Sequence, residues 1–159
     1  MRRIVIIAHN LRSTYNVGSL LRTAEGLGAL DIYLTGYTPY PLLADDTRLP
    51  HISKKIDAQI CKISLGAEKL VNVTHSEDIF PLIQALKDDG FLVAALEQNT
   101  NSSSLEEFHP PDKLAIIIGR EVEGIEAEIL GQCDLILEIP MFGKKESFNV
   151  IQATAMALS

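Results

Sequence analysis

The stretch IVIIAHNLRSTYNVGSLLR, residues 4–22, decides the fold of this 159-residue chain. Its first five residues form a continuous apolar run rich in β-branched side chains, which predicts a strand buried on both faces. Beyond it, apolar side chains recur at helical spacing, namely Val17, Leu20, Leu21, Ala24 and Leu27. Gly28 can end that helix in a left-handed conformation, so the chain is expected to open with a strand and then a helix.

The same alternation of strand and helix patterns continues along the chain. Apolar runs predict further strands at residues 31–34, 71–73, 91–96, 114–118 and 135–139. Residues 35–50 and 99–104 have loop compositions, whereas residues 52–70 have the pattern of a broken helix. We therefore expect one α/β domain over residues 1–159, with a mostly parallel sheet and helices on both faces. The wholly apolar run 114–118 is expected to be a central strand.

Two later helices complete this prediction. Ser76 is expected to cap a helix that Gly90 ends, and its core-facing residues are predicted to be Ile79, Leu82, Ile83 and Leu86. Pro140 ends the last strand because proline cannot donate to the ladder. Ser147 or Asn149 is expected to begin a C-terminal helix.

Composition narrows the class of protein. With 47% hydrophobic residues, the chain is expected to form one globular core. No apolar run approaches the ~20 residues of a membrane span, and the N-terminus lacks an apolar signal core, so we expect a cytoplasmic protein. Cys61 and Cys133 are the only cysteines, and no His lies at a metal-ligand spacing from them. We expect reduced core thiols and no metal site.

The net charge of −7 argues against indiscriminate binding of polyanions, because such binding depends on basic residues. The charge is unevenly distributed. Residues 1–62 hold eight Lys and Arg against five Asp and Glu, and the remainder holds six against sixteen. A local basic face could therefore meet RNA or a phosphate-bearing ligand, although most of these charges are expected to be solvated surface.

Three polar turns that contain glycine are associated with the predicted strands. They are Asn16-Val-Gly-Ser-Leu-Leu-Arg22, Gly119-Arg-Glu-Val-Glu-Gly124, and Ile139-Pro-Met-Phe-Gly143, which runs into Ser147-Phe-Asn-Val150. Ligands of open α/β sheets bind at the carboxyl ends of the strands, so these turns predict a site there. The glycine fingerprints of dinucleotide-binding folds and of phosphate-binding loops are both absent from the sequence.

In order and spacing, the three turns resemble the three motifs of the SpoU (TrmH-like) family of SPOUT methyltransferases, and the resemblance spans nearly the whole chain. It implies an α/β knot, with a deep C-terminal trefoil knot over about residues 91–159. It further implies S-adenosylmethionine bound in the knot and an active site completed across a homodimer. The implied reaction is methyl transfer to a ribose 2′-hydroxyl of tRNA or rRNA, with no metal and no membrane.

The resemblance also implies residue roles by position. Arg22 is the implied catalytic arginine at the acceptor hydroxyl, Asn16 orients the same region, and Glu121 and Asn149 brace it. The residues implied to line the cofactor cleft are Leu96, Gly119, Ile139, Met141 and Phe148. The implied substrate contacts are Arg12, Lys144 and Ser147. Phe148 replaces the leucine usual in the family, which alters packing volume more than polarity.

Physical chemistry limits what Arg22 can do. Neutralising an arginine of pKa about 12.5 near pH 7 would cost on the order of 7 kcal/mol, so general-base work is unfavourable. A charged Arg22 can instead stabilise alkoxide character and hold an adjacent phosphate. Because a sulfonium donor is already activated, alignment of the reacting groups can supply most of the remaining rate.

Plainer roles remain open for several of these residues. Glu121, Ser147 and Asn149 could be helix caps, and Lys144 could lie in a solvated turn. His9 could touch substrate or be a hydrogen-bonded structural histidine. For the whole chain, the alternatives are a non-catalytic RNA-binding or scaffold protein that retains the knotted fold, and an α/β nucleotide-binding enzyme of another family. The leading prediction is an S-adenosylmethionine-dependent RNA ribose 2′-O-methyltransferase.

Overall fold

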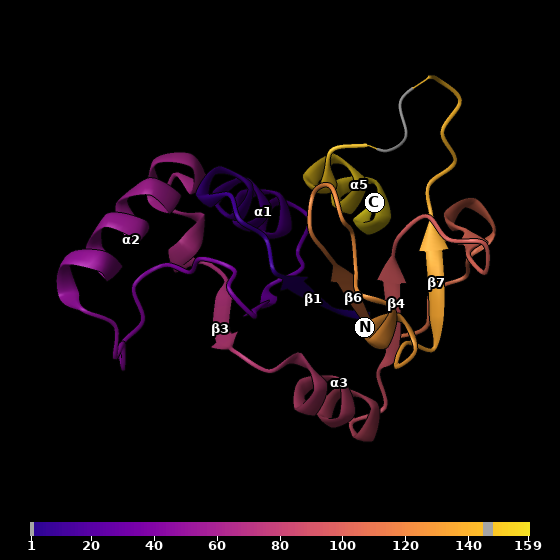
Figure 1. The fold of residues 1–159 in the computed structure, drawn as a ribbon, viewed down its shortest axis with the longest axis horizontal. Coiled ribbons are helices and arrows are strands. Elements are labelled where there is room, and N and C mark those ends of the chain that lie inside the picture. The colour runs from indigo at the N-terminus through magenta and orange to yellow at the C-terminus, as the bar shows by residue number, and fades with distance from the viewer. Residues whose placement is uncertain (1, 145–147) are drawn as a thin grey trace.

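A computed structural model describes residues 2–144 and 148–159, and in them the chain forms one seven-stranded sheet (Figure 1). The strands are β1 (Arg3–His9), β2 (Asp31–Thr35), β3 (Asn72–Ser76), β4 (Leu92–Leu96), β5 (Ser103–Ser104), β6 (Lys113–Ile118) and β7 (Leu135–Glu138). Their order is β3-β2-β1-β6-β4-β7-β5, and every neighbouring pair is parallel. The predicted parallel sheet is confirmed, and β6 is its central strand.

Helices cover both faces of the sheet, as predicted (Figure 1). They are α1 (Thr14–Gly26), α2 (Pro50–Ser64), α3 (Ile79–Asp88), α4 (Ala127–Leu130) and α5 (Val150–Leu158), with short 3-10 helices η1 (Ala67–Lys69) and η2 (Leu105–Glu107). On one face, α1 lies between α2 and α5. On the other face, the apolar residues of α3 and α4 pack against the sheet. None of the described helices is long and apolar enough to cross a lipid bilayer.

The register of β1 and β6 explains why both runs are wholly apolar. Ile6 pairs with Ile116 and packs on the α1 face, whereas Ile7 pairs with Ile117 and packs on the α3 face. These four side chains are buried because successive residues of a strand point to opposite faces and both faces are covered. The two strands thus form the centre of the core, and their carboxyl ends are held rigidly.

The N-terminal cap of α3 differs from the prediction. Ser76 is the last residue of β3, where it pairs with Thr35, so it cannot begin the helix. Asp78 is the cap instead, and its carboxylate accepts the Phe80 backbone N–H at 3.0 Å. The strand is longer than its apolar residues indicate, because polar Asn72, Thr74 and Ser76 also take part in the pairing.

Two segments predicted to be loops contain regular structure. Pro50 is the first residue of α2, where its fixed φ suits the helix and its missing N–H is not needed. Ser103 and Ser104 pair with β7 as the short edge strand β5. The predicted break within residues 52–70 is confirmed, because Leu65 and Gly66 both have positive φ between α2 and η1.

Candidate active site

The carboxyl ends of β4, β6 and β7 surround a cavity of about 280 Å³. The residues that line it are Leu96, Glu97, Gln98, Gly119, Arg120, Glu121, Val122, Gly124, Glu138, Ile139, Phe148, Val150 and Ala153. Of the residues predicted to line a cofactor cleft, Leu96, Gly119, Ile139 and Phe148 are on its wall, whereas Met141 is not. The second and third sequence motifs therefore border one cavity.

Two glycines shape the loop that forms one side of this cavity. A Cβ on Gly119 would lie 2.5 Å from Cγ1 of Ile125, so only glycine fits at the end of β6. Gly124 has φ +72, and a Cβ there would collide with the Glu97 carboxylate. That carboxylate accepts the Ile125 backbone N–H at 2.7 Å, which ties the end of the loop to the end of β4.

A side-chain hydrogen bond joins the first motif to the second. Asn16, in the first turn of α1, donates from Nδ2 to Oε1 of Glu121 at 3.0 Å. Its backbone N–H donates to the side chain of Ser13, which caps the helix. Asn16 is only 8% exposed, so Ser13 holds its backbone N–H and Glu121 holds its side-chain amide, with little contact to solvent. Asn16 and Glu121, two of the residues predicted for the site, are therefore in direct contact.

Arg12 forms a second, more exposed contact with the same loop. Its Nη2 donates to Oε1 of Glu123 at 3.2 Å, and the two side chains are 68% and 42% exposed. The pKa of Arg12 is raised, first by a hydrogen bond with the Tyr37 side chain and then by the charge of Glu123. Arg12 therefore remains a cation on the surface beside the Gly119–Gly124 loop, where a phosphate could exchange with Glu123.

Arg22 lies on the exposed face of α1 and does not line the cavity. Within residues 2–144 and 148–159, its guanidinium makes no ion pair and no hydrogen bond. Lys144 is also exposed and away from the cavity wall. Ser147, the remaining predicted substrate contact, lies outside the described residues. A single chain thus brings Asn16 and Glu121 together without bringing Arg22 to the same wall.

Asn149 is the N-cap of α5, and its Oδ1 accepts the Ile151 backbone N–H at 2.9 Å. The capping role that the sequence left open is therefore present. The cap fixes the first turn of α5, where Val150 and Ala153 line the cavity. Asn149 itself is not among the lining residues.

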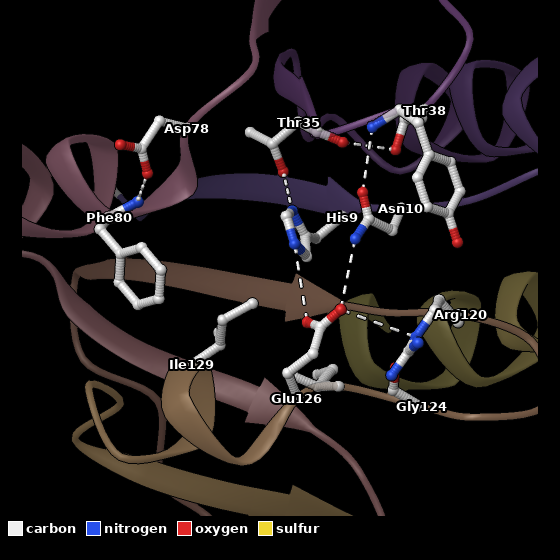
Figure 2. Close-up of polar contacts among 12 residues, drawn as sticks. His9, Asn10, Thr35, Thr38, Asp78, Phe80, Arg120, Gly124, Glu126 and Ile129 are labelled. Carbon is white, nitrogen blue, oxygen red and sulfur yellow. Dashed lines mark hydrogen bonds and ion pairs between the residues drawn. The ribbon is translucent and has the colours of Figure 1, made fainter.

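Sequence reasoning missed two carboxylates at this edge of the sheet, Glu97 and Glu126. Glu97 accepts the Ile125 N–H at the end of the Gly119–Gly124 loop, and Glu126 lies beside Arg120 of that loop. Glu97 directly follows an apolar strand, which is a signal that could have found it. Figure 2 shows Glu126 between His9, Asn10 and Arg120. His9 is 8% exposed and its Nδ1 lies 2.8 Å from Oγ1 of Thr35, so it has the structural role that the sequence left as an alternative.

The thiols do not offer a nucleophile. Cys61 and Cys133 are both free, and burial raises their pKa to about 12 and about 11, respectively. Both are therefore protonated near neutral pH. In the described part of the chain, no group of three or more His, Cys, Asp or Glu side chains could hold a metal ion.

Comparison with known proteins identifies the family. The model of the SpoU rRNA Methylase family matches residues 3–159. A tRNA (guanosine(18)-2′-O)-methyltransferase of Borreliella burgdorferi is 27% identical over 98% of this chain, and the chain spans 64% of that protein. An AdoMet-bound rRNA methyltransferase of Sinorhizobium meliloti superposes with a TM-score of 0.80 at 20% identity, over 98% of this chain and 54% of its own. The TrmH/SpoU tRNA-modifying enzyme of A. aeolicus also gives a TM-score of 0.80, at 22% identity, over 99% of this chain and 73% of its own. With a family match over nearly its whole length, this chain belongs to the SpoU rRNA methylase family.

Proposed function

We propose that this chain carries an S-adenosylmethionine-dependent RNA ribose 2′-O-methyltransferase activity directed at tRNA or rRNA. The observation that carries the proposal is the Asn16–Glu121 hydrogen bond, which connects the predicted acceptor side of the site to the wall of the cavity. Family membership supports the same reaction class. The proposed activity resides in a single domain over residues 1–159.

The charges of the cavity suit a cationic ligand. Among the described residues, Glu97, Glu121 and Glu138 line it, against the single guanidinium of Arg120. The Arg120 Nε is already engaged, because it donates to the Gly124 carbonyl at 3.0 Å. A wall with this excess of carboxylates disfavours a phosphate and favours a sulfonium or an ammonium group. This balance supports S-adenosylmethionine over the phosphate-bearing cofactors of other α/β nucleotide-binding enzymes.

The walls of the cavity also suit an adenosine group. Leu96, Ile139 and Phe148 provide apolar surface, and Gly119 contributes polar backbone groups to the same wall. Polar backbone groups beside apolar side chains are the usual lining of a small-molecule site. We propose that Met141, which is off the cavity wall on the segment between β7 and α5, lies near the bound cofactor. When bound, S-adenosylmethionine supplies a methyl group activated by its sulfonium.

The side chains of the first motif then act on the acceptor ribose. In this proposal the charged Arg22 stabilises negative charge that develops on the attacking 2′-oxygen. Asn16, held by Glu121, orients the same hydroxyl, and the Asn149 cap positions the part of α5 that borders the cofactor. Arg12, Lys144 and Ser147 contact RNA phosphates or sugars. Alignment of the hydroxyl with the methyl group provides the remaining acceleration.

We further propose that the active site is completed in a homodimer, in which Arg22 of one protomer faces the cavity of the other. The exposed position of Arg22, off the wall of its own cavity, supports this arrangement. Val122 and Phe142 are 92% and 90% exposed, and large apolar side chains that protrude beside a site are typical of an interface.

A deep trefoil knot over about residues 91–159 is part of the proposal. The strand order supports it, because the chain runs from β4 to the edge strand β5, crosses to β6, and then returns to place β7 between β4 and β5. From there it reaches α5, which packs against α1 on one face (Figure 1). We place the protein in the cytoplasm, where RNA substrates are available and Cys61 and Cys133 remain reduced.

The decisive experiment is incubation of the purified protein with methyl-labelled S-adenosylmethionine and bulk tRNA or rRNA. Labelled 2′-O-methyl nucleosides in the digested RNA support the proposal. Binding of RNA without cofactor binding or methyl transfer would instead favour the non-catalytic RNA-binding or scaffold alternative. Calorimetry with S-adenosylmethionine alone separates these two outcomes.

A further inference from the structure

One partly exposed carboxylate, that of Glu126, contacts the ends of two central strands (Figure 2). Oε1 of Glu126 accepts from Nδ2 of Asn10 at 3.3 Å and lies 3.7 Å from Nε of Arg120. Its Oε2 lies 3.6 Å from Nε2 of His9. His9 ends β1, Asn10 follows it, and Arg120 follows β6, so Glu126 joins the carboxyl ends of β1 and β6.

The same contacts extend to the end of β2. The Nδ1 atom of His9 lies 2.8 Å from Oγ1 of Thr35, and Oδ1 of Asn10 accepts the Tyr37 backbone N–H at 3.0 Å. Asn10 has φ +57, which is uncommon for a residue other than glycine and is retained only where surrounding contacts require it. A Cβ on Gly36 would collide with Oδ1 of Asn10, so the turn after β2 is built around this side chain.

The groups around the His9 ring favour a proton on its Nε2 atom. If Nε2 carries the proton, it faces the Oε2 atom of Glu126 as a donor, and Nδ1 accepts from the Thr35 hydroxyl. The opposite tautomer would place two acceptors against each other. Oε2 of Glu126 has no hydrogen-bond partner within the described residues and no access to solvent, so the Nε2–H is its nearest donor. A proton on Nε2 of His9 therefore gives the Oε2 atom of Glu126 a donor.

Arg120 connects this cluster to the loop that borders the cavity. Arg120 donates from Nε to the Gly124 carbonyl at 3.0 Å, and the Gly124 N–H donates to the Arg120 carbonyl at 3.1 Å. These bonds close the Gly119–Gly124 loop, and Oε1 of Glu126, which does not line the cavity, lies 3.7 Å from the same Nε. Glu121, at the centre of the loop, is the acceptor for Asn16.

We propose that Glu126 is a positioning residue for the methyl-transfer site. It holds Arg120 against the end of β1 and so fixes the loop in the conformation in which Glu121 meets Asn16. Glu126 does not line the cavity, and its effect on a ligand is exerted through the loop. The inference rests on the proposed function, because S-adenosylmethionine is the ligand whose site the loop borders.

Calorimetry tests this role by measuring the affinity of the full chain for S-adenosylmethionine. The unchanged protein is compared with three variants, Glu126→Ala, Glu126→Gln and Glu128→Gln. Glu128 is a matched control because it lies on the adjoining helix α4, is exposed, and carries the same charge. Glu126→Ala is expected to weaken binding about tenfold, the equivalent of one charge-assisted hydrogen bond. Glu126→Gln should weaken it less, because an amide oxygen can still accept from Asn10. Glu128→Gln should bind as the unchanged protein does.

A double-mutant cycle with Glu121→Ala separates positioning from a general loss of structure. If Glu126 acts through the loop, adding Glu126→Ala to Glu121→Ala should weaken binding by less than about twofold more. Equal affinities for Glu126→Ala and Glu128→Gln, or fully additive effects in the cycle, would overturn the inference. If Glu126→Ala does not fold, Glu126→Gln carries the same test. Failure of the unchanged protein to bind S-adenosylmethionine would instead overturn the proposed function, and the positioning role with it.

Discussion

Asn16 and Glu121 are 105 positions apart in the sequence, yet the amide nitrogen of one lies 3.0 Å from a carboxylate oxygen of the other. The contact spans two neighbouring strands of the sheet, because α1 begins after β1 and Glu121 follows β6. It depends on Gly119 and Gly124, which allow the loop to turn back over the end of β6. The Asn16–Glu121 hydrogen bond thus holds the first motif in a fixed position relative to the wall of the cavity.

Changing Asn16 should reveal how much its hydrogen bond to Glu121 contributes to stability. Asn16→Ala removes a hydrogen bond to a solvent-accessible carboxylate and should lower the free energy of unfolding by about 1 kcal/mol. Asn16→Asp should be worse, because it places two carboxylates together. Combining Asn16→Asp with Glu121→Gln restores a donor and an acceptor and should recover most of the loss. Urea unfolding gives the free energy of unfolding of the unchanged protein, the two single variants of Asn16 and the double variant. A double variant no more stable than Asn16→Asp would contradict this pairing.

Much of the fold follows from the sequence because burial leaves a direct pattern in it. The runs at β1 and β6 are apolar at every position, and both faces of these strands are covered. Edge and polar elements leave no such pattern. β5 consists of Ser103 and Ser104, and β3 includes Asn72, Thr74 and Ser76, so their pairing depends on neighbouring strands rather than on their own side chains.

The candidate site was predicted in a similarly uneven way. Gly119 and Gly124 stand where a Cβ would collide with neighbouring atoms, so the loop requires glycine at both positions. The spacing of these glycines in the sequence is what predicted the loop. Glu126 was missed because it is a single carboxylate with no local pattern, whereas Glu97 has only its position after an apolar strand to mark it; the partners of both are distant in the sequence. The position of Arg22 relative to a cavity could not be predicted either, because helical spacing alone does not say which neighbour its exposed face meets.

Gly124→Ala should damage the cavity more than the fold. The substitution combines a positive φ with a collision against Glu97, so we expect a loss of about 1–3 kcal/mol in the free energy of unfolding. Affinity for S-adenosylmethionine should fall as well, since the loop must move. Gly131→Ala is the matched control, because a Cβ there meets only carbonyl oxygens at 3.5 Å and the backbone is right-handed helical. Calorimetry and thermal unfolding of both variants give the comparison, and equal behaviour of the two would refute it.

Arg22→Ala should abolish methyl transfer while leaving the protein intact. Arg22 is exposed, so the free energy of unfolding should change by no more than about 0.5 kcal/mol. Affinity for S-adenosylmethionine should also be nearly unchanged, because Arg22 does not line the cavity of its own chain. Arg22→Lys keeps the charge but loses the planar fork, and should recover only part of the activity. Parallel loss of transfer and cofactor affinity in Arg22→Ala would contradict its placement at the acceptor.

The stability of the protein should depend on pH through His9. The pKa of His9 is lowered from 6.5, chiefly by burial, with the charge of Glu126 acting to raise it and that of Arg120 acting to lower it further. Thr35 and Asn10, the other polar side chains of this cluster, are uncharged. Below pH 6.5 the unfolded chain binds the proton more readily than the folded one, so stability is present above that pH and is lost as the pH falls through the folded-state pKa. The slope should reach at most about 1.4 kcal/mol per pH unit for this one group. Urea unfolding between pH 5 and about 8 measures it.

His9→Gln should flatten the curve below pH 6.5, whereas His109→Gln, at an exposed histidine, should leave it unchanged. An identical slope in His9→Gln would show that another group titrates in this range.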